Sequence, residues 1–449
     1  MLKNGLYNII GAVIRVGITF LTIPVIIRLM GIEEYGLWTL VSTVIGIVGL
    51  AEGGLSISTT VFLSRDLANE DVKAISQTLT VSLIGMLVLA DVAALILWVG
   101  APEITKLFTQ LKPSQLAIAL PALRYGGFII WARLLQQIFV AIEQAYQQYG
   151  LMNFLNTVQA GLTNIGMIAV AWSGGRTLEL MQWHLVVAFG MLVAHTLAAW
   201  QSLGKIKPSL VWSSNKGREL IEYSFMTWLT SLGSALFGQC DRLIVGGILG
   251  TKLLGIYAGI TSITTQINTL SALAVQPLLP KLASLLQNKT TNQLILYKQI
   301  KQVQQMNILI AIGLGTGLLI FTPMVFNFIF PGISNQEYTL AFRIAIVIYS
   351  LYSLNAVGYY SLLSLGAVKT STVILISSSL ISLLMIYFGA TYWGLLGASI
   401  GNAGYICTLM CTVLALKYLN IPTQQWICWI QPLELLLLPM TIFRQKNSK

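Results

Sequence analysis

Residues 29–38 read LMGIEEYGLW, and residues 248–257 read ILGTKLLGIY. A shift of 219 positions superimposes three pairs of residues: Gly31 on Gly250, Gly36 on Gly255, and Trp38 on Tyr257. In both copies an apolar span ends just before the motif and another begins just after it. Because the shift is close to half of the 449-residue chain, the sequence predicts a duplicated, two-part membrane protein.

The composition excludes an ordinary water-soluble protein. Hydrophobic residues make up 56% of the chain and charged residues only 9%, against roughly 25% charged residues in soluble domains. The apolar residues form runs of about twenty, which is the length of a membrane-spanning helix. The runs do not alternate polar and apolar residues, so helices are expected rather than a barrel.

Twelve spans are expected, six in each half. Their ranges are 5–29, 36–63, 75–100, 115–145, 150–172, 181–203, 219–249, 254–285, 300–330, 337–365, 370–390 and 393–418. The predicted organisation is an N-terminal lobe (1–204), a basic linker (205–218), a C-terminal lobe (219–420) and a C-terminal segment (421–449). Prolines and Glu434 interrupt residues 421–443, so this last segment is expected to be a partial or interfacial helix.

The distribution of basic residues predicts the orientation in the membrane. The net charge is +11, but the lysines and arginines lie singly between apolar spans, which does not suggest nucleic acid. If the N-terminus is cytoplasmic, thirteen basic residues in the twelve-span unit lie on the inner side and five on the outer side. We therefore expect both ends of this unit inside, and every activity within or across the bilayer.

Ionisable residues inside the spans are the strongest functional signal. A charge at the centre of a bilayer costs about 2.5–3.5 kcal/mol on insertion scales, so it should face a protein interior or a wet cavity. The basic members of this set are all arginines: Arg15, Arg124, Arg133, Arg242 and Arg343. The acidic members are candidates for ion coupling or for internal ion pairs: Glu52, Asp91, Glu143 and Asp241.

The preference for arginine indicates an anionic ligand. Lysine can lose its proton on burial, whereas arginine stays charged and binds phosphate or carboxylate oxygens two at a time. A phosphate-bearing ligand is one explanation for the five arginines, and pairing with the four acids is the other. Arg15 and Arg133 lie near the middle of their spans, which makes them the first candidates.

Polar residues also recur at helical spacing along several spans. In the fourth span, Arg133, Gln136, Gln137, Gln144 and Gln148 form one seam, which predicts a hydrophilic lumen that could bind sugar hydroxyls, or bonds between helices.

Two further seams predict lining of a cavity or tight helix packing. In the first span the seam is Asn8, Gly11, Arg15, Thr19 and Thr22. In the second span the seam is Ser42, Gly46, Gly49, Gly53, Ser56 and Thr60, with Glu52 beside it. His184 and His195 lie nearly on one face of the sixth span, where packing is the first interpretation and a proton relay the second.

Motifs for chemistry are missing from the sequence. It has no phosphate-binding Gly-x-x-x-x-Gly-Lys-Ser/Thr loop, no nucleophile–histidine–acid set and no cluster of metal ligands. We therefore expect neither an enzyme nor a cofactor or metal. Energy should come from an ion gradient such as H+ or Na+, from the substrate gradient or from a partner.

Several stretches resemble the polysaccharide-biosynthesis flippases, the Wzx-type exporters of the multidrug/oligosaccharidyl-lipid/polysaccharide (MOP) superfamily. They are the two glycine motifs, SRDLANED at 64–71, CDRLIVGGILG at 240–250 and GLLGASIG at 394–401. The resemblance covers about residues 1–420. It implies an all-α, MATE-like fold of two six-helix, pseudo-symmetric lobes around a central cationic cavity, in the bacterial inner membrane.

The resemblance also implies a cargo, a polyprenyl-diphosphate-linked oligosaccharide flipped to the outer leaflet for surface polysaccharides such as O-antigen. The diphosphate would meet arginines of the cavity, and the sugars would meet Gln136, Gln137 and Gln144. Expected partners are membrane lipids and the polysaccharide polymerase or export machinery. A cation-coupled multidrug antiporter and a membrane-embedded glycan polymerase or ligase are the alternatives.

Overall fold

The computed structural model describes residues 14, 17–18, 20–204, 209–276, 282, 293–333 and 335–419, all of them in helices or the turns between helices. The first helix is described from Phe20 to Met30. The further elements are α2 (Ile32–Val48), η1 (Gly49–Glu52), α3 (Leu55–Ala68), α4 (Val72–Lys106), α5 (Pro113–Ala145), α6 (Tyr149–Trp172), α7 (Thr177–Leu203), α8 (Ser214–Ala235), η2 (Leu236–Cys240), α9 (Asp241–Val275), α11 (Gln293–Ile320), α12 (Thr322–Ile329), α13 (Gln336–Ser353), α14 (Ala356–Ser364), α15 (Val368–Gly401), η3 (Asn402–Leu409) and α16 (Met410–Tyr418).

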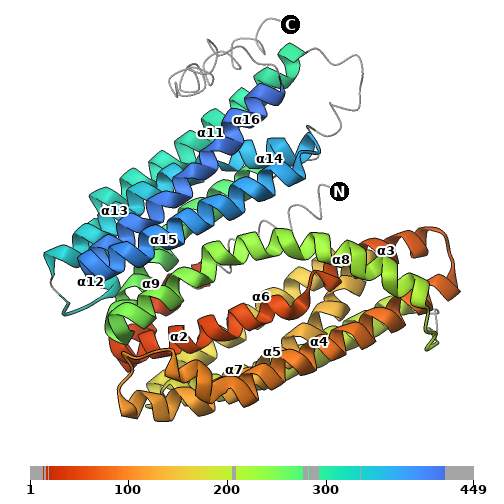
Figure 1. Cartoon of the computed structure of the whole chain (residues 1–449), viewed down its shortest axis with the longest axis horizontal. Coiled ribbons are helices and arrows are strands. Elements are labelled where there is room, and N and C mark those ends of the chain that lie inside the picture. The colour runs from red at the N-terminus through yellow and green to blue at the C-terminus, as the bar shows by residue number, and fades with distance from the viewer. Residues whose placement is uncertain are drawn as a thin grey trace, which may run out of the picture. The chain divides into compact units, whose positions relative to one another are not determined.

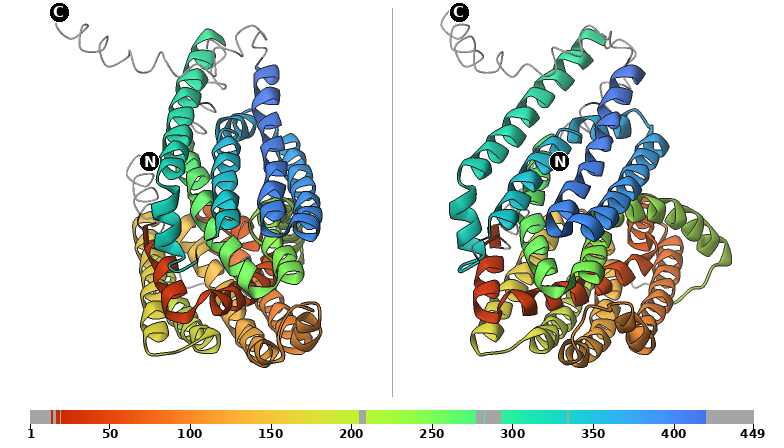
Figure 2. Two further views of the ribbon diagram at one scale, coloured as in Figure 1. Left: turned by 90° about the vertical axis from the view of Figure 1, so that its left-hand side faces the viewer. Right: turned by 60° about the vertical axis from the view of Figure 1, so that its left-hand side comes forward.

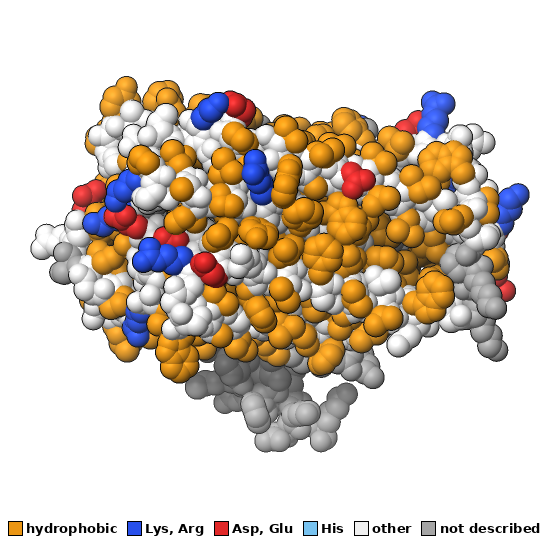
Figure 3. Space-filling view, turned by 90° about the horizontal axis from the view of Figure 1, so that it is seen from below, with side chains coloured by type: hydrophobic (Ala, Val, Ile, Leu, Met, Phe, Trp, Pro, Cys, Tyr) orange, Lys and Arg blue, Asp and Glu red, His pale blue; other side chains and the backbone are white. Residues whose placement is uncertain are grey.

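Within the described residues, nine helical stretches are long and apolar enough to cross a membrane. Some of them join two of the predicted spans, because a helix continues across a sharp bend at Gly250 or at Gly394. The face shown in Figure 3 is mostly hydrophobic, and most of its charged side chains lie nearer its two ends, with a basic and an acidic side chain between them. Such a band of apolar surface between charged ends is what a bilayer requires.

The chain forms two compact units, residues 1–259 with 329–331 (unit 1) and residues 260–328 with 332–449 (unit 2). In unit 1, α5 is the central helix: it packs against α2, α3, α4, α6 and α7 (Figure 1). In unit 2, α13 packs against α11 and α15, and α14 packs against α16 (Figure 2). The lobe boundaries at residues 204 and 219 were predicted from the sequence repeat, and they stay a prediction.

Polar contacts fix both ends of the helices of unit 1. At the end where α2 and α5 begin, Lys112 Nζ lies 3.0 Å from Glu33 Oε2. At the opposite end, Lys216 in the first turn of α8 is buried, 2.8 Å from Asp66 of α3. Lys216 was predicted to be a linker residue, but α8 begins at Ser214 and includes it. Asp66 also accepts a 2.6 Å hydrogen bond from Thr78 of α4. The carboxylate of Asp66, in the motif SRDLANED, therefore holds α3, α4 and α8 together.

The two glycine motifs contact each other inside unit 1. A Cβ atom on Gly36 would collide with the backbone carbonyl of Thr251, and a Cβ atom on Gly255 would collide with the carbonyl of Ile32. Gly36 and Ile32 are the repeat mates of Gly255 and Thr251, so the two contacts are reciprocal. Only glycine allows backbones to approach this closely.

Candidate functional site

An amide-lined cavity of about 450 Å3 lies between α5 and α6 in unit 1. From α5 it is lined by Arg133, Gln136, Gln137, Val140 and Gln144, and from α6 by Met152, Asn156 and Gln159. Arg133 and Gln144 are eleven residues apart, which corresponds to about 16 Å along a helix. The cavity therefore extends from near the turn between α5 and α6 toward the middle of the span, with Arg133 at the end nearer the middle.

Arg133 is the only ionisable residue among the described residues that line this cavity. Its guanidinium forms no hydrogen bond or ion pair with any described residue. His184 of α7 is close enough to experience the charge of Arg133, but it offers no carboxylate to neutralise it. A fixed positive charge is therefore available to a ligand at this depth.

The amide groups of the cavity are partly paired and partly available. Gln136 donates to Gln159 over 3.0 Å, and Gln144 accepts a hydrogen bond from Thr60 of α3 over 3.1 Å. Gln137 and Asn156 form no hydrogen bond with the described residues. Both interpretations of the Gln seam thus apply, since it lines a cavity and also ties helices together.

The α6 side of the cavity was missed in the sequence. Met152, Asn156 and Gln159 recur at steps of four and three residues, so they share one helix face. The same spacing identified the seam on the fourth span, and it would have identified this face too. Gln148, predicted as part of the α5 seam, accepts a hydrogen bond from Ser202 of α7 instead.

The second span is broken at mid-length, between α2 and α3. Gly53 and Gly54 both adopt left-handed backbone conformations, with φ of 64° and 72°. Two side chains of α8 donate to carbonyls beside the break: Trp228 Nε1 to Leu50 O over 2.8 Å and Thr227 Oγ1 to Gly54 O over 3.2 Å, in addition to the backbone N–H groups of Gly53 and Ser58. Broken helices with internally satisfied carbonyls are typical of ligand sites in transporters.

Glu52 lies in this break, where Ser56 donates a hydrogen bond to its carboxylate. Two contacts set the register between this span and α5. A Cβ atom on Gly49 would lie 3.0 Å from Ile130 Cδ1, and Thr60 bonds to Gln144. Glu52 is therefore level with the turn of α5 that carries Arg133 and Gln136, although no ion pair joins Glu52 to Arg133.

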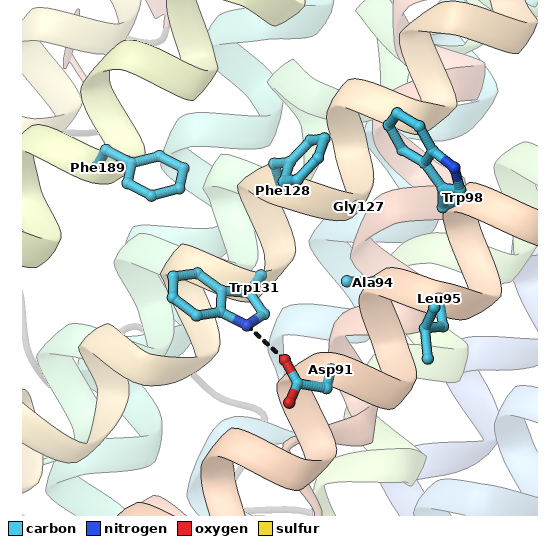
Figure 4. A pocket seen from close by; sticks show the side chains of 8 residues that line it. All are labelled: Asp91, Ala94, Leu95, Trp98, Gly127, Phe128, Trp131 and Phe189. Carbon is cyan, nitrogen blue, oxygen red and sulfur yellow. Dashed lines mark hydrogen bonds between the residues drawn. The ribbon is translucent and has the colours of Figure 1, made fainter.

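Asp91 and Arg124 lie outside the amide-lined cavity. Asp91 of α4 is exposed, and its carboxylate accepts a 2.8 Å hydrogen bond from Trp131 Nε1 in an aromatic groove (Figure 4). Asp91 therefore lies in this groove and not in the amide-lined cavity, and its predicted role in ion coupling stays a prediction. The Arg124 guanidinium lies 5.4 Å from the centre of the Trp98 ring, a cation–π contact on the same groove.

Arg343 lines a separate polar cavity of about 640 Å3 in unit 2. Its other polar lining residues are Asn327, Asn335, Gln336 and Thr339. Arg343 itself is exposed. The structure thus places Arg343 and Arg133 in different cavities of different units.

Two of the predicted acids are buried with partners. Glu143 Oε1 of α5 lies 2.8 Å from His195 Nδ1 of α7, so His195 is paired with a carboxylate and does not merely pack. Asp241 at the start of α9 accepts a 3.0 Å hydrogen bond from Tyr257, and Arg242 follows it, half-buried. Arg15, the other first candidate, lies outside the described residues.

The family model of polysaccharide biosynthesis proteins matches residues 1–286. A Shigella flexneri protein named "Putative O-antigen transporter" is 22% identical over 410 residues, which cover 89% of this chain and 93% of that protein. The resemblance seen in the sequence motifs is therefore confirmed.

Solved structures of other membrane transporters share the fold. An inward-facing multidrug transporter of the MATE family in the MOP superfamily superimposes with a TM-score of 0.73 at 15% identity, over 91% of this chain and 97% of that one. The lipid II flippase MurJ in an inward closed conformation gives 0.75 at 13% identity, over 100% and 94%. The predicted all-helical, multi-span, MATE-like fold is confirmed, and the chain belongs to the polysaccharide biosynthesis protein family.

Proposed function

We propose that this chain flips a polyprenyl-diphosphate-linked oligosaccharide from the cytoplasmic to the outer leaflet of the bacterial inner membrane by alternating access. The observation that carries the proposal is Arg133, which lines an amide-lined cavity near the middle of its span and has no ion-pair partner among the described residues. The Shigella relative, named as an O-antigen transporter, and the fold shared with a lipid II flippase support the same class of cargo.

Arg133 is the proposed contact for the diphosphate. A guanidinium remains charged when it is buried, and its planar donors match two phosphate oxygens at once. A diphosphate entering the cavity would replace water around Arg133 without breaking an existing ion pair among the described residues. Arg15, Arg242 and Arg343 remain secondary candidates for contacts elsewhere along the path, whereas Arg124 lies over Trp98 and outside the cavity.

The amides are the proposed contacts for the sugars. Gln137 and Asn156 have donors and acceptors to offer, and Gln136, Gln144 and Gln159 retain further hydrogen-bonding capacity beside their present bonds. Amides bind hydroxyl groups without adding charge, so a cavity of this kind suits uncharged sugars that follow a charged headgroup. The polyprenyl tail would stay in the lipid.

The composition of the cavity argues against an antiporter of organic cations. Such a transporter needs carboxylates at its binding surface, and the described lining of this cavity contains none. A positively charged drug would instead be repelled by Arg133 in a medium of low dielectric constant.

The experiment compares Arg133→Ala, Arg133→Lys and wild type in a strain that lacks the chromosomal gene. We expect Arg133→Ala to reduce surface polysaccharide at least ~10-fold, the effect of losing one charge-assisted phosphate contact of about 1.5–3 kcal/mol. Arg133→Lys should retain part of the activity, because the charge remains but the two-point grip is lost. Lipid-linked intermediates, measured by mass spectrometry, should accumulate in step with the loss.

Arg124→Ala is the matched control, because Arg124 is on the same helix but lies over Trp98, outside the cavity. It should leave export within about twofold of wild type. Normal export by Arg133→Ala at a normal protein level would show that this cavity does not hold the diphosphate.

A further inference from the structure

A carboxylate and an imidazole are paired in the membrane-spanning part of unit 1, outside the proposed cargo cavity. Glu143 lies near the end of α5 and His195 in the last third of α7. The atoms Glu143 Oε1 and His195 Nδ1 are 2.8 Å apart, and both side chains are fully buried, with 0% of their surface exposed.

Each partner has a second polar atom that the pair leaves unused. Glu143 Oε2 and His195 Nε2 are buried and form no hydrogen bond with the described residues. Buried polar atoms are normally hydrogen-bonded, and a buried ion pair stabilises a fold only when its remaining atoms are also satisfied. The two unsatisfied atoms would make this pair a weak source of stability. A pair that gains and loses a proton, by contrast, needs an atom that is free to accept the proton.

A largely apolar cluster includes near neighbours of the pair along α5 and α7. Phe139 and Tyr146 lie one turn before and one turn after Glu143 on α5, and Ala199 lies one turn after His195 on α7. The helices packed against this cluster contribute four apolar side chains: Leu63 and Leu67 from α3, and Ile75 and Leu79 from α4.

The other titratable groups near the pair are not suited to exchange a proton in its place. Burial raises the pKa of the Tyr146 phenol, so Tyr146 stays neutral at physiological pH. Asp66 on α3 is already bonded to Lys216. Arg133 is ten residues before Glu143, which is about 15 Å along α5.

The charge of the pair depends on one proton. A carboxylate beside a neutral imidazole has one net negative charge, and one added proton makes the pair neutral overall. That proton resides on the imidazole as imidazolium or on the carboxylate as the acid. Burial among apolar groups favours the neutral total, whereas contact with water tolerates the charged one.

The pair lies where a change in the α5–α7 contact would reach the cavity. Gln144, the residue after Glu143, lines the cavity and is bonded to Thr60. Farther toward the α5–α6 turn, the bond between Gln148 and Ser202 is a second tie between these segments, without a titratable group. Loss of the Glu143–His195 bond would loosen α7 from α5 at the end of the cavity near this turn.

We propose that the Glu143–His195 pair is the proton-binding site that couples a proton gradient to cargo movement through the neighbouring cavity. Proton uptake from one side closes the pair, and proton release to the other side opens it. The inference rests on the proposed function, since it names the coupling ion for that transport.

The first test needs no cargo. The chain contains two histidines, so the imidazole signals of the purified full-length protein can be assigned with His184→Gln. We expect the His195 signal to titrate together with an infrared carboxyl band that is absent from Glu143→Gln. A His195 signal that stays constant from about pH 5 to pH 9, the range in which imidazoles change charge, would overturn the proposal.

The second test measures coupling in proteoliposomes, with diphosphate-linked oligosaccharide extracted from the deletion strain as the probe. For one proton per cargo, a gradient of one pH unit should hold the cargo ratio between the leaflets ~10-fold away from unity in wild type. Glu143→Gln and His195→Gln should equilibrate the cargo to a ratio of about one with or without the gradient. Gln148→Ala, which removes the neighbouring tie but no titratable group, should keep the ~10-fold ratio.

The outcomes separate the two proposals. A gradient response of wild-type size in both pair variants would overturn the coupling role and leave the proposed function intact. A wild-type protein that moves no cargo under any condition would overturn the proposed function, and the coupling role with it.

Discussion

The second span and its repeat mate begin alike and then differ. Both enter through a glycine with positive φ, 85° at Gly31 and 78° at Gly250, and both have a second glycine five residues later. After one further helical stretch, the first copy reads GLAEGG at 49–54 and breaks, whereas the second copy reads NTLSAL at 268–273 and stays helical. Both copies thus have the glycine motif at the start of the span, but only the first copy has a bend in the middle of the span.

The difference between the two copies shows which of them contains an interrupted helix. Two consecutive residues with left-handed φ cost little as glycines and about 1–2 kcal/mol each as other residues. Glu52 in the break is level with the turn of α5 that carries Arg133, and two side chains of α8 bond to carbonyls beside the break. α9 carries no equivalent break, so the bend near the candidate cavity is a property of the first copy.

The largest effect is expected at the motif that the two copies share. Gly36→Ala and Gly255→Ala each place a Cβ atom on a backbone carbonyl, which cannot move aside as a side chain can. We expect each substitution to destabilise the protein by about 1–3 kcal/mol or more and to remove most folded protein from the membrane. Fluorescence-detected size exclusion of the extracted protein measures this loss.

Gly247→Ala is the control for the shared motif, because a Cβ atom there would have no neighbour within 4 Å. It should give a wild-type elution profile. Tolerance of alanine at Gly255 but not at Gly36 would mean that the contact is not reciprocal.

A smaller effect is expected where the copies differ, at the mates Gly53 and Ala272. Gly53→Ala forces φ of 64° on alanine, at a cost of about 1–2 kcal/mol, although the new Cβ atom meets only ordinary contacts. We expect a several-fold loss of polysaccharide export with the protein still present in the membrane. The opposite swap, Ala272→Gly, costs about 1 kcal/mol as a glycine within a helix, and export should be unchanged. Equal export by both variants would refute a functional role for the bend.

The smallest effect is expected at the bond that stabilises the break. Trp228→Phe keeps an aromatic ring but removes the hydrogen bond to Leu50 O, worth about 1 kcal/mol. Amide hydrogen exchange should therefore become ~5-fold faster at residues 49–54 and remain unchanged at 268–273. Unchanged exchange in both segments would show that Trp228 does not hold the break.

Much of the fold could be predicted because it depends on local patterns. The apolar runs gave the spans, and the paired glycines gave the repeat. The break could not be predicted in this way. Gly46, Gly49 and Gly53 recur at steps of three and four residues, which reads as a packing seam of a continuous helix. The interruption is seen only in the left-handed backbone of Gly53 and Gly54 in the structure.

The candidate site was predicted only in part, for a similar reason. Arg133 and the glutamines of α5 follow a spacing that one helix imposes. The opposite wall, the pairing of Glu143 with His195 and the burial of Lys216 against Asp66 depend on which helices become neighbours. Residues 52 and 150 positions apart cannot be matched by periodicity, so charge counting assigned Lys216 to a linker.

The reciprocal meeting of Gly36 with Thr251 and of Gly255 with Ile32 has a consequence for the origin of the chain. A contact in which each side uses the same residues is the hallmark of a twofold homodimer. A half-length ancestor carrying a single motif would already have possessed the surface needed to pair with its own copy. Fusion of two such copies would then have required a connecting segment and no new interface, and it would have left each half free to diverge.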